Sequence, residues 1–335
     1  MSGREQIAAI FGCSATSLTP DERAFFRDAD PTGFILFARN CASPDQVRGL
    51  VAELRGVVGR ADAPVLIDQE GGRVARLGPP HWRKYPAARV LAACGAEAVR
   101  LGALLIADDL AALGITVDCM PVLDLPTAGA DPVIGDRAYG DTPDEVIALG
   151  RAAGEGLLAG GVIPVLKHIP GHGRATVDSH LALPRVEAPL PSLEAHDFAP
   201  FRALASMPWA MTAHVVYEAL DPDAAATLSP RLIGNTIRAS IGFDGFLVSD
   251  DLSMQALHGA LGDRARRALA AGCDAVLHCN GRMDEMTEIA SAATPLSVDA
   301  RRRLAAGEAM RTEQARPFDR HEAELRFAAL TGGDG

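Results

Sequence analysis

The strongest constraint on the fold is a regular alternation of short apolar or β-branched runs with longer amphipathic stretches. A parallel sheet with helical crossovers requires this alternation. Eight runs are predicted as strands, near Ile7–Gly12, Gly33–Arg39, Pro64–Asp68, Val117–Leu125, Val162–His168, Trp209–His214, Gly245–Asp250 and Asp274–Cys279. Helical spacing is found over Pro44–Gly59, Ala96–Leu113, Thr142–Ala159, Leu193–Ala205, Ser229–Ile241 and Met254–Ala271.

Eight strands with intervening helices predict an α/β fold, a single-domain (β/α)8 barrel of the TIM type. A doubly wound open sheet is the alternative, because strand order cannot be read from one sequence. We expect one domain over residues 1–335. Helices from about residue 282 would close the barrel, and residues 331–335 would form a frayed tail.

Composition excludes several classes of function. A net charge of −11 repels a phosphate backbone, so nucleic acid is not an expected partner. The apolar stretches, such as Val162–Leu166, fall far short of the roughly 20 residues that span a bilayer. The N-terminus lacks the features of a signal peptide, which predicts a cytoplasmic protein. Six cysteines without C-x-x-C spacing indicate thiols rather than disulfides or a zinc site.

Polar side chains stand at the ends of four predicted strands: Asp68, then Lys167-His168, His214, and Asp250-Asp251. In a barrel these ends meet on one face, where active sites are built from the loops that follow. Each taken alone has a structural explanation, because an Asp after a strand often caps the next helix. Four such ends together predict a functional site.

Two Gly-containing loops add candidate ligand-binding groups. Ile67–Arg76 runs from a strand end through a Gly-Gly loop, which allows close approach of a ligand to the backbone. Asp68 and Arg76 offer an acceptor and a donor fork for sugar hydroxyls, although a helix cap and a surface ion pair would explain them equally well. Val133–Gly140 places Arg137 in a second such loop, which alone would be read as surface.

The densest group of titratable side chains lies between Lys167 and His180. His168 and His172 are four residues apart, but the Pro-Gly pair between them prevents the helix that a zincin site needs. Asp178 and His180 are two apart, so in an extended loop they project to the same side and form a carboxylate–imidazole dyad.

A further segment, Val248–Met254, ends a strand in two adjacent carboxylates. Adjacent side chains on an extended chain point in different directions, so one carboxylate can enter a pocket while the other serves the turn.

These four segments, in this order, resemble the β-N-acetylhexosaminidases of glycoside hydrolase family 3. The signatures Lys-His-Ile-Pro-Gly-His-Gly followed by Asp-Ser-His, and Ser-Asp-Asp-Leu-Ser-Met, are long and unusual, and the similarity covers nearly the whole chain. Members with this layout are bacterial cell-wall-recycling enzymes with a (β/α)8 barrel that cleave terminal N-acetylglucosamine from muropeptide fragments. Many relatives carry a second α/β domain, which we do not expect here.

The resemblance implies a role for each matching residue. Asp250 would be the nucleophile, His180 the acid/base on a mobile loop, and Asp178 its partner. The groups that would hold the sugar are Asp68, Arg76, Arg137, Lys167 and His168. A free imidazole has a pKa near ~6.5, and a bonded carboxylate favours its cationic form, so the dyad could donate a proton. A covalent glycosyl-enzyme would then give retention, without metal or cofactor.

The glycines and small residues from Pro170 to His180 predict a mobile lid. Other mechanisms stay open on the sequence alone. A metal-dependent hydrolase would use His168, His172, Asp178 and His180 as ligands. A substrate-assisted hexosaminidase would use Asp250-Asp251 to orient the acetamido group, and phosphate could replace water as the acceptor. A non-catalytic sugar-binding barrel would need neither dyad nor nucleophile.

Overall fold

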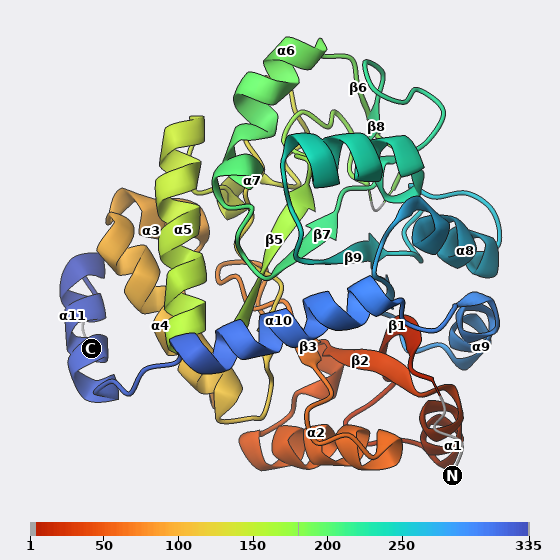
Figure 1. Cartoon of the computed structure of the whole chain (residues 1–335). Helices are drawn as coiled ribbons and strands as arrows, with labels where there is room; N and C mark the ends of the chain where they lie inside the picture. The colour runs from red at the N-terminus through yellow and green to blue at the C-terminus, as the bar shows by residue number, and fades with distance from the viewer. Residues whose placement is uncertain (1–4, 180, 334–335) are drawn as a thin grey trace.

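The computed structural model describes residues 5–179 and 181–333. Eight parallel strands close into a barrel in the order β1-β10-β9-β7-β5-β4-β3-β2 (Figure 1). Their bounds are β1 Ile7–Gly12, β2 Pro31–Leu36, β3 Val65–Ile67, β4 Val117–Asp118, β5 Ile163–Ile169, β7 Trp209–Thr212, β9 Phe246–Asp251 and β10 Ala275–His278. Each lies in or overlaps a predicted run. The predicted barrel is confirmed, and the doubly wound sheet is wrong.

Helices surround the barrel (Figure 1). They are α1 Pro20–Ala29, α2 Pro44–Val58, α3 Ala88–Ala93, α4 Ala96–Ala111, α5 Pro143–Ala159, α6 Leu190–Ser192, α7 Ala199–Ala203, α8 Leu261–Ala271, α9 Met283–Ala292, α10 Val298–Gln314 and α11 Arg320–Thr331. Residues 193–197 and 232–240 are π-helical. Two short strands, β6 Arg185–Val186 and β8 Val216–Tyr217, pair outside the barrel.

Several elements differ from the prediction. The short elements α3, α6, β6 and β8 were not predicted, and the helices expected over Leu193–Ala205 and Ser229–Ile241 contain the π-helical residues 193–197 and 232–240. Helix α1 was not predicted because its many charged residues hide the apolar face, although Thr19 and Glu22 form a capping box at its start. The helix expected over Met254–Ala271 begins only at Leu261. The chain before it makes turns around Gly259, which has a positive φ of 93°.

Side chains from alternate strand positions fill the barrel interior, as a closed sheet requires. Ile10, Leu66, Val165 and Val248 belong to this inner cluster, whereas neighbours such as Phe11 pack outward against the helices. Helix α10 crosses the barrel strands in Figure 1 and covers the inner cluster at the amino ends of the strands. The barrel is therefore a packed core that leaves its carboxyl-end face for function.

The C-terminal helices pack on the barrel and on the helices that surround it. In α11, the Phe327 ring lies against Gly102 of α4, where an added Cβ would come within 3.1 Å of it. Helix α11 continues through Thr331 and ends at Gly332 in the left-handed conformation that glycine favours. Residues 334–335 of the expected tail lie outside the described residues. Within the described part of the chain, no helix has both the length and the apolar character to cross a membrane.

Candidate functional site

A cavity of about 400 Å³ opens at the carboxyl ends of the barrel strands. The predicted site residues that line it are Asp68, Arg76, Arg137, Lys167, His168, Asp178 and Asp250. They come from the ends of three strands, β3, β5 and β9, and from the loops between, so the fold brings together residues that are up to 182 positions apart. His180 lies outside the described residues.

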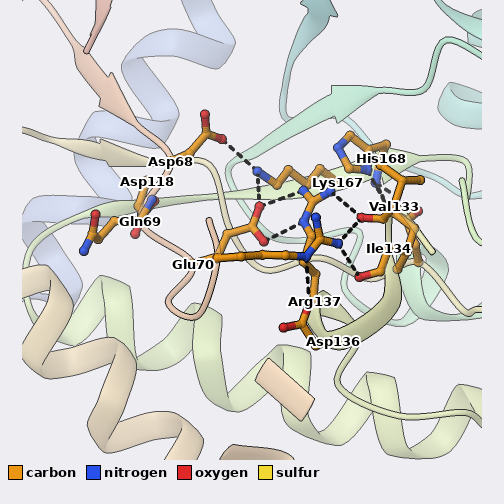
Figure 2. A network of polar contacts seen from close by, with 12 residues as sticks. Asp68, Gln69, Glu70, Asp118, Val133, Ile134, Asp136, Arg137, Lys167 and His168 are labelled. Carbon is orange, nitrogen blue, oxygen red and sulfur yellow. Dashed lines mark hydrogen bonds and ion pairs between the residues drawn. The ribbon is translucent and has the colours of Figure 1, made fainter. Parts of the chain in front are cut away.

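One wall of the cavity is built on a chain of alternating charges, which we call the charge chain: Arg76, Asp68, Lys167, Glu70 and Arg137. Figure 2 shows the part of it from Asp68 to Arg137. Asp68 joins Arg76 Nη2 and Lys167 Nζ, both at 2.9 Å. Glu70 Oε1 lies 2.7 Å from Lys167 Nζ. Arg137 donates to both oxygens of Glu70 at 2.8 Å, in a bidentate pair.

Burial makes these contacts strong. The side chains of Lys167 and Glu70 are only 3% and 5% exposed. Burial alone would raise the pKa of the Glu70 carboxyl, but the charges of Lys167 and Arg137 outweigh it and lower the pKa to about 2. The same balance holds the pKa of Asp68 below its usual range and that of Lys167 above its own. All of these groups are therefore ionised at neutral pH.

Sequence reasoning missed Glu70, which binds two of the predicted residues. A signal was available, because Asp68 and Glu70 are two residues apart after a strand and so can project to the same side. Its partner Arg137 is 67 residues away in the sequence, so the pair itself becomes visible only in the folded chain.

His168 is oriented by a second residue that the sequence analysis missed. Its Nδ1 lies 2.6 Å from Asp124, which is fully buried and also accepts from the backbone N–H of His168 and of His172. Burial raises the pKa of Asp124, but the neighbouring imidazoles and donors lower it overall. A carboxylate at Nδ1 fixes a proton on that atom. We infer that His168 presents Nε2 to the cavity that it lines.

The two carboxylates that end β9 have different surroundings. Asp250 Oδ1 accepts from the Asp251 backbone N–H at 2.8 Å, and Asp250 lines the cavity. Asp251 accepts from the Ser253 hydroxyl at 2.6 Å, from the Ser253 N–H, and from the Cys279 N–H just after β10. The Asp251 carboxylate thus ties the turn to the end of β10, as expected for one of the pair, but Asp251 also lines the cavity beside Asp250.

The loop after β5 differs from the prediction of a mobile segment over Pro170–His180. Gly171, His172 and Gly173 are buried. A Cβ at Gly173 would lie 1.9 Å from the carbonyl oxygen of Leu125, and the Gly171 carbonyl accepts from the Tyr217 hydroxyl. The prediction of mobility is wrong for this half of the loop, because its glycines serve close packing instead of flexibility.

Over residues 5–179 and 181–333, no group of three or more His, Cys, Asp and Glu side chains is placed to hold a metal ion. Two members of the metal alternative, His168 and His172, are engaged with Asp124 and with Ser179. All six cysteines are thiols.

Asp118, below the charge chain, gives a testable pH dependence of stability. It is fully buried, accepts from the Gln69 N–H at 2.9 Å, and burial raises its pKa from 3.8 to about 8. The folded chain therefore keeps this proton between pH 4 and pH 8, where the unfolded chain has lost it. As a result, the free energy of unfolding falls as the pH rises through that window.

We expect Asp118→Asn to remove this slope, because an amide accepts from Gln69 without titrating. The Tm of the variant should exceed that of the parent by at least about 3 °C at pH 8, with a smaller difference at pH 5. Thermal unfolding of both proteins over that pH range measures it. Parallel Tm curves would show that Asp118 titrates normally in the folded chain.

Comparison with known proteins identifies the family. The model of the glycosyl hydrolase family 3 N-terminal domain matches residues 6–306. A Beta-hexosaminidase from Alkalilimnicola ehrlichii is 42% identical over 282 residues, 81% of this chain and 80% of that protein. One from Methylococcus capsulatus is 40% identical over 278 residues, 81% of this chain and 82% of that protein.

Solved structures agree. NagZ from Neisseria gonorrhoeae in complex with N-trifluoroacetyl-D-glucosamine superimposes with a TM-score of 0.87 at 32% identity, covering 99% of this chain and all of that one. A family 3 β-N-acetylglucosaminidase from Paenibacillus gives a TM-score of 0.85 at 31% identity, with 97% of this chain and 67% of that one covered. The resemblance seen in the motifs is confirmed: the chain belongs to glycosyl hydrolase family 3 and is a glycoside hydrolase of the β-hexosaminidase type.

Proposed function

We propose that this enzyme is a retaining β-N-acetylhexosaminidase that removes terminal β-linked N-acetylglucosamine from muropeptide fragments of peptidoglycan, in the cytoplasm, during cell-wall recycling. The whole chain would act as one catalytic domain. The observation that carries the proposal is the placement of Asp250 and the charge chain around one cavity. The names of the relatives and the amino-sugar ligand of the Neisseria structure support the substrate class.

The charge chain suits a neutral, hydroxyl-rich ligand. A sugar hydroxyl both donates and accepts, so it can bridge a carboxylate and a neighbouring cation. Asp68 supplies a fixed acceptor, while Arg76, Lys167 and Arg137 supply fixed donors. Glu70 lies behind the lining and holds Lys167 and Arg137 in place. Because each charge is already paired, the wall binds a sugar without requiring a counter-charge from it.

Asp250 is assigned as the nucleophile of a double displacement. Its carboxylate attacks the anomeric carbon and the leaving oxygen takes a proton from His180, which gives a glycosyl-enzyme. The neutral imidazole then removes a proton from water, which attacks the same carbon and releases the sugar with retained configuration. Asp178, which lines the cavity with Asp250, would hold the imidazole and favour its cationic form before donation.

His180→Ala is expected to separate substrates by leaving group. For a natural disaccharide, kcat/KM should fall at least about 100-fold, because the alkoxide leaving group needs a proton. For a dinitrophenyl glycoside the loss should stay below about tenfold, since the phenolate departs without one. Initial rates on both substrates decide the point. Equal losses would mean that the proton donor is another residue.

Asp178→Asn is expected to move the pH–rate profile. The amide keeps the size of the side chain but no longer stabilises the imidazolium, so the limb that reports loss of the donor proton should shift to lower pH. Profiles of kcat/KM for parent and variant give the shift directly. An unmoved limb would make Asp178 a structural residue.

Two related mechanisms remain as alternatives: substrate-assisted cleavage, and transfer to phosphate. In the first, Asp251 would help to orient the acetamido group, but its carboxylate is already held by Ser253 and the Cys279 N–H. Trapping with an activated 2-fluoro sugar separates the first alternative, since only the covalent route labels Asp250. An assay of a chromogenic N-acetylglucosaminide with and without phosphate tests the second, because phosphorolysis releases a sugar phosphate.

A further inference from the structure

The loop that follows β5 passes through an exposed stretch and becomes buried again within a few residues. Thr176 and Val177 are exposed, but Ser179, two positions on, is only 3% exposed. A polar side chain buried at this point needs partners. The partners of Ser179 show which residues hold the loop in place beside the cavity.

The side chain of Ser179 is held by His172. The two share a hydrogen bond of 3.0 Å between the hydroxyl oxygen and Nε2, and His172 is itself 3% exposed. Burial lowers the pKa of His172 to about 4, so the ring is neutral under ordinary conditions. In the described part of the chain, Nδ1 of His172 has no partner, which leaves the bond to Ser179 as the ring's hydrogen bond.

Each of the two residues that share this hydrogen bond is also held through its backbone by another part of the site. The backbone N–H of His172 donates to Asp124 at 2.6 Å, and Asp124 also holds His168. The carbonyl oxygen of Ser179 accepts from the Ala256 N–H at 3.2 Å, in the turns that follow β9. A continuous set of polar contacts therefore runs from the wall beside His168, through His172 and Ser179, to the turns that follow β9.

Asp178 immediately precedes Ser179 and lines the cavity. We propose that Ser179 is a positioning residue, which through its hydrogen bond to His172 holds Asp178 at the cavity that Asp250 also lines. This inference rests on the proposed function, because it concerns the delivery of a proton to the leaving oxygen. It predicts that loss of the bond mimics, in weaker form, loss of the donor.

Ser179→Thr and Ser179→Val test the proposal as a matched pair, since the two side chains have nearly the same shape and only Thr keeps the hydroxyl. With a phenyl N-acetylglucosaminide, kcat/KM of the Val variant should be at least about tenfold below that of the Thr variant, the equivalent of one lost hydrogen bond. With the dinitrophenyl glycoside the two should agree within about threefold, because that leaving group needs little protonation.

Controls separate positioning from folding. Thr176→Ala removes an exposed hydroxyl from the same loop and should leave the ratio of the two rates unchanged. The double variant His172→Ala/Ser179→Ala should be no slower on the phenyl glycoside than the slower single variant, since both changes break one bond. Thermal unfolding of each variant confirms that the folded enzyme is compared.

The outcomes are distinct. A Val variant that slows both glycosides equally relative to Thr would overturn the positioning role, provided that His180→Ala shows the leaving-group dependence. If His180→Ala lacks that dependence, the proposed donor is wrong and the role of Ser179 falls with it. Additive effects of the His172 and Ser179 changes would also overturn the proposal, because they would show that the two residues act separately.

Discussion

Asp250→Asn is expected to lower kcat at least about 10⁴-fold, while the enzyme still binds N-acetylglucosamine. The substitution removes the attacking oxygen's charge but leaves the charge chain intact, so the loss falls on the chemical step and not on ground-state binding. The amide oxygen can still accept from the Asp251 N–H, which preserves the end of β9. Single-turnover rates and sugar binding by calorimetry measure the two quantities separately.

The matched control is Asp251→Asn, one residue further on. Its carboxylate binds Ser253 and the Cys279 N–H, so this change should lower the stability of the turn and slow turnover far less than Asp250→Asn. Covalent trapping with the 2-fluoro sugar should label Asp250 in the parent. Label on Asp251, or near-normal turnover by Asp250→Asn, would remove Asp250 from the role of nucleophile.

Glu70→Gln has the second-largest expected effect, on stability and activity together. Three cations and two carboxylates make up the charge chain, and this change leaves the buried Arg137 without its carboxylate and Lys167 with Asp68 alone. Uncompensated buried charge typically costs about 3–5 kcal/mol. Since Arg137 also loses its bidentate partner and Lys167 one of its two, their orientation toward the cavity is weakened and kcat/KM should fall at least about 100-fold.

A second substitution distinguishes charge from shape. Adding Lys167→Met to Glu70→Gln restores the original charge balance, so the double variant should regain part of the free energy of unfolding while activity stays low. Urea unfolding of the parent, both single variants and the double variant gives the coupling. Strictly additive stability losses would show that Glu70 and Lys167 do not depend on each other.

The sequence was sufficient to predict the barrel and three of the four strand ends expected at the cavity. The fourth, His214, does not line it: its side chain is fully buried and bonds to Thr227 and to the carbonyl oxygen of Asp251. Strand periodicity is local, and closure of the sheet then places Asp68, Lys167 and Asp250 on one face without further information. The partners of these residues could not be predicted in this way. Asp124 lies inside a predicted strand and Glu70 in a loop, and only the three-dimensional closure brings them to His168 and Arg137.

Glycine was the other source of error. Gly171 and Gly173 suggested flexibility in the sequence, but in the structure Gly171 has a positive φ of 139° against Asp197, and the backbone of Leu125 leaves no room for a Cβ at Gly173. The two uses of glycine look alike in a single sequence, because what distinguishes them is a neighbour distant along the chain, here Leu125 and Asp197. The exposed part of the same loop is limited to residues such as Thr176 and Val177.

The position of β1 between β2 and β10 has a consequence for biosynthesis. The first strand of the chain cannot complete its pairing until the last strand, Ala275–His278, has been made, and residues 294–296 then add bonds to its amino end. During translation the growing sheet therefore carries an apolar, unpaired edge at β1 for most of its synthesis. Such edges invite association between nascent chains, so folding yield in the cell should depend on chaperones that shield β1.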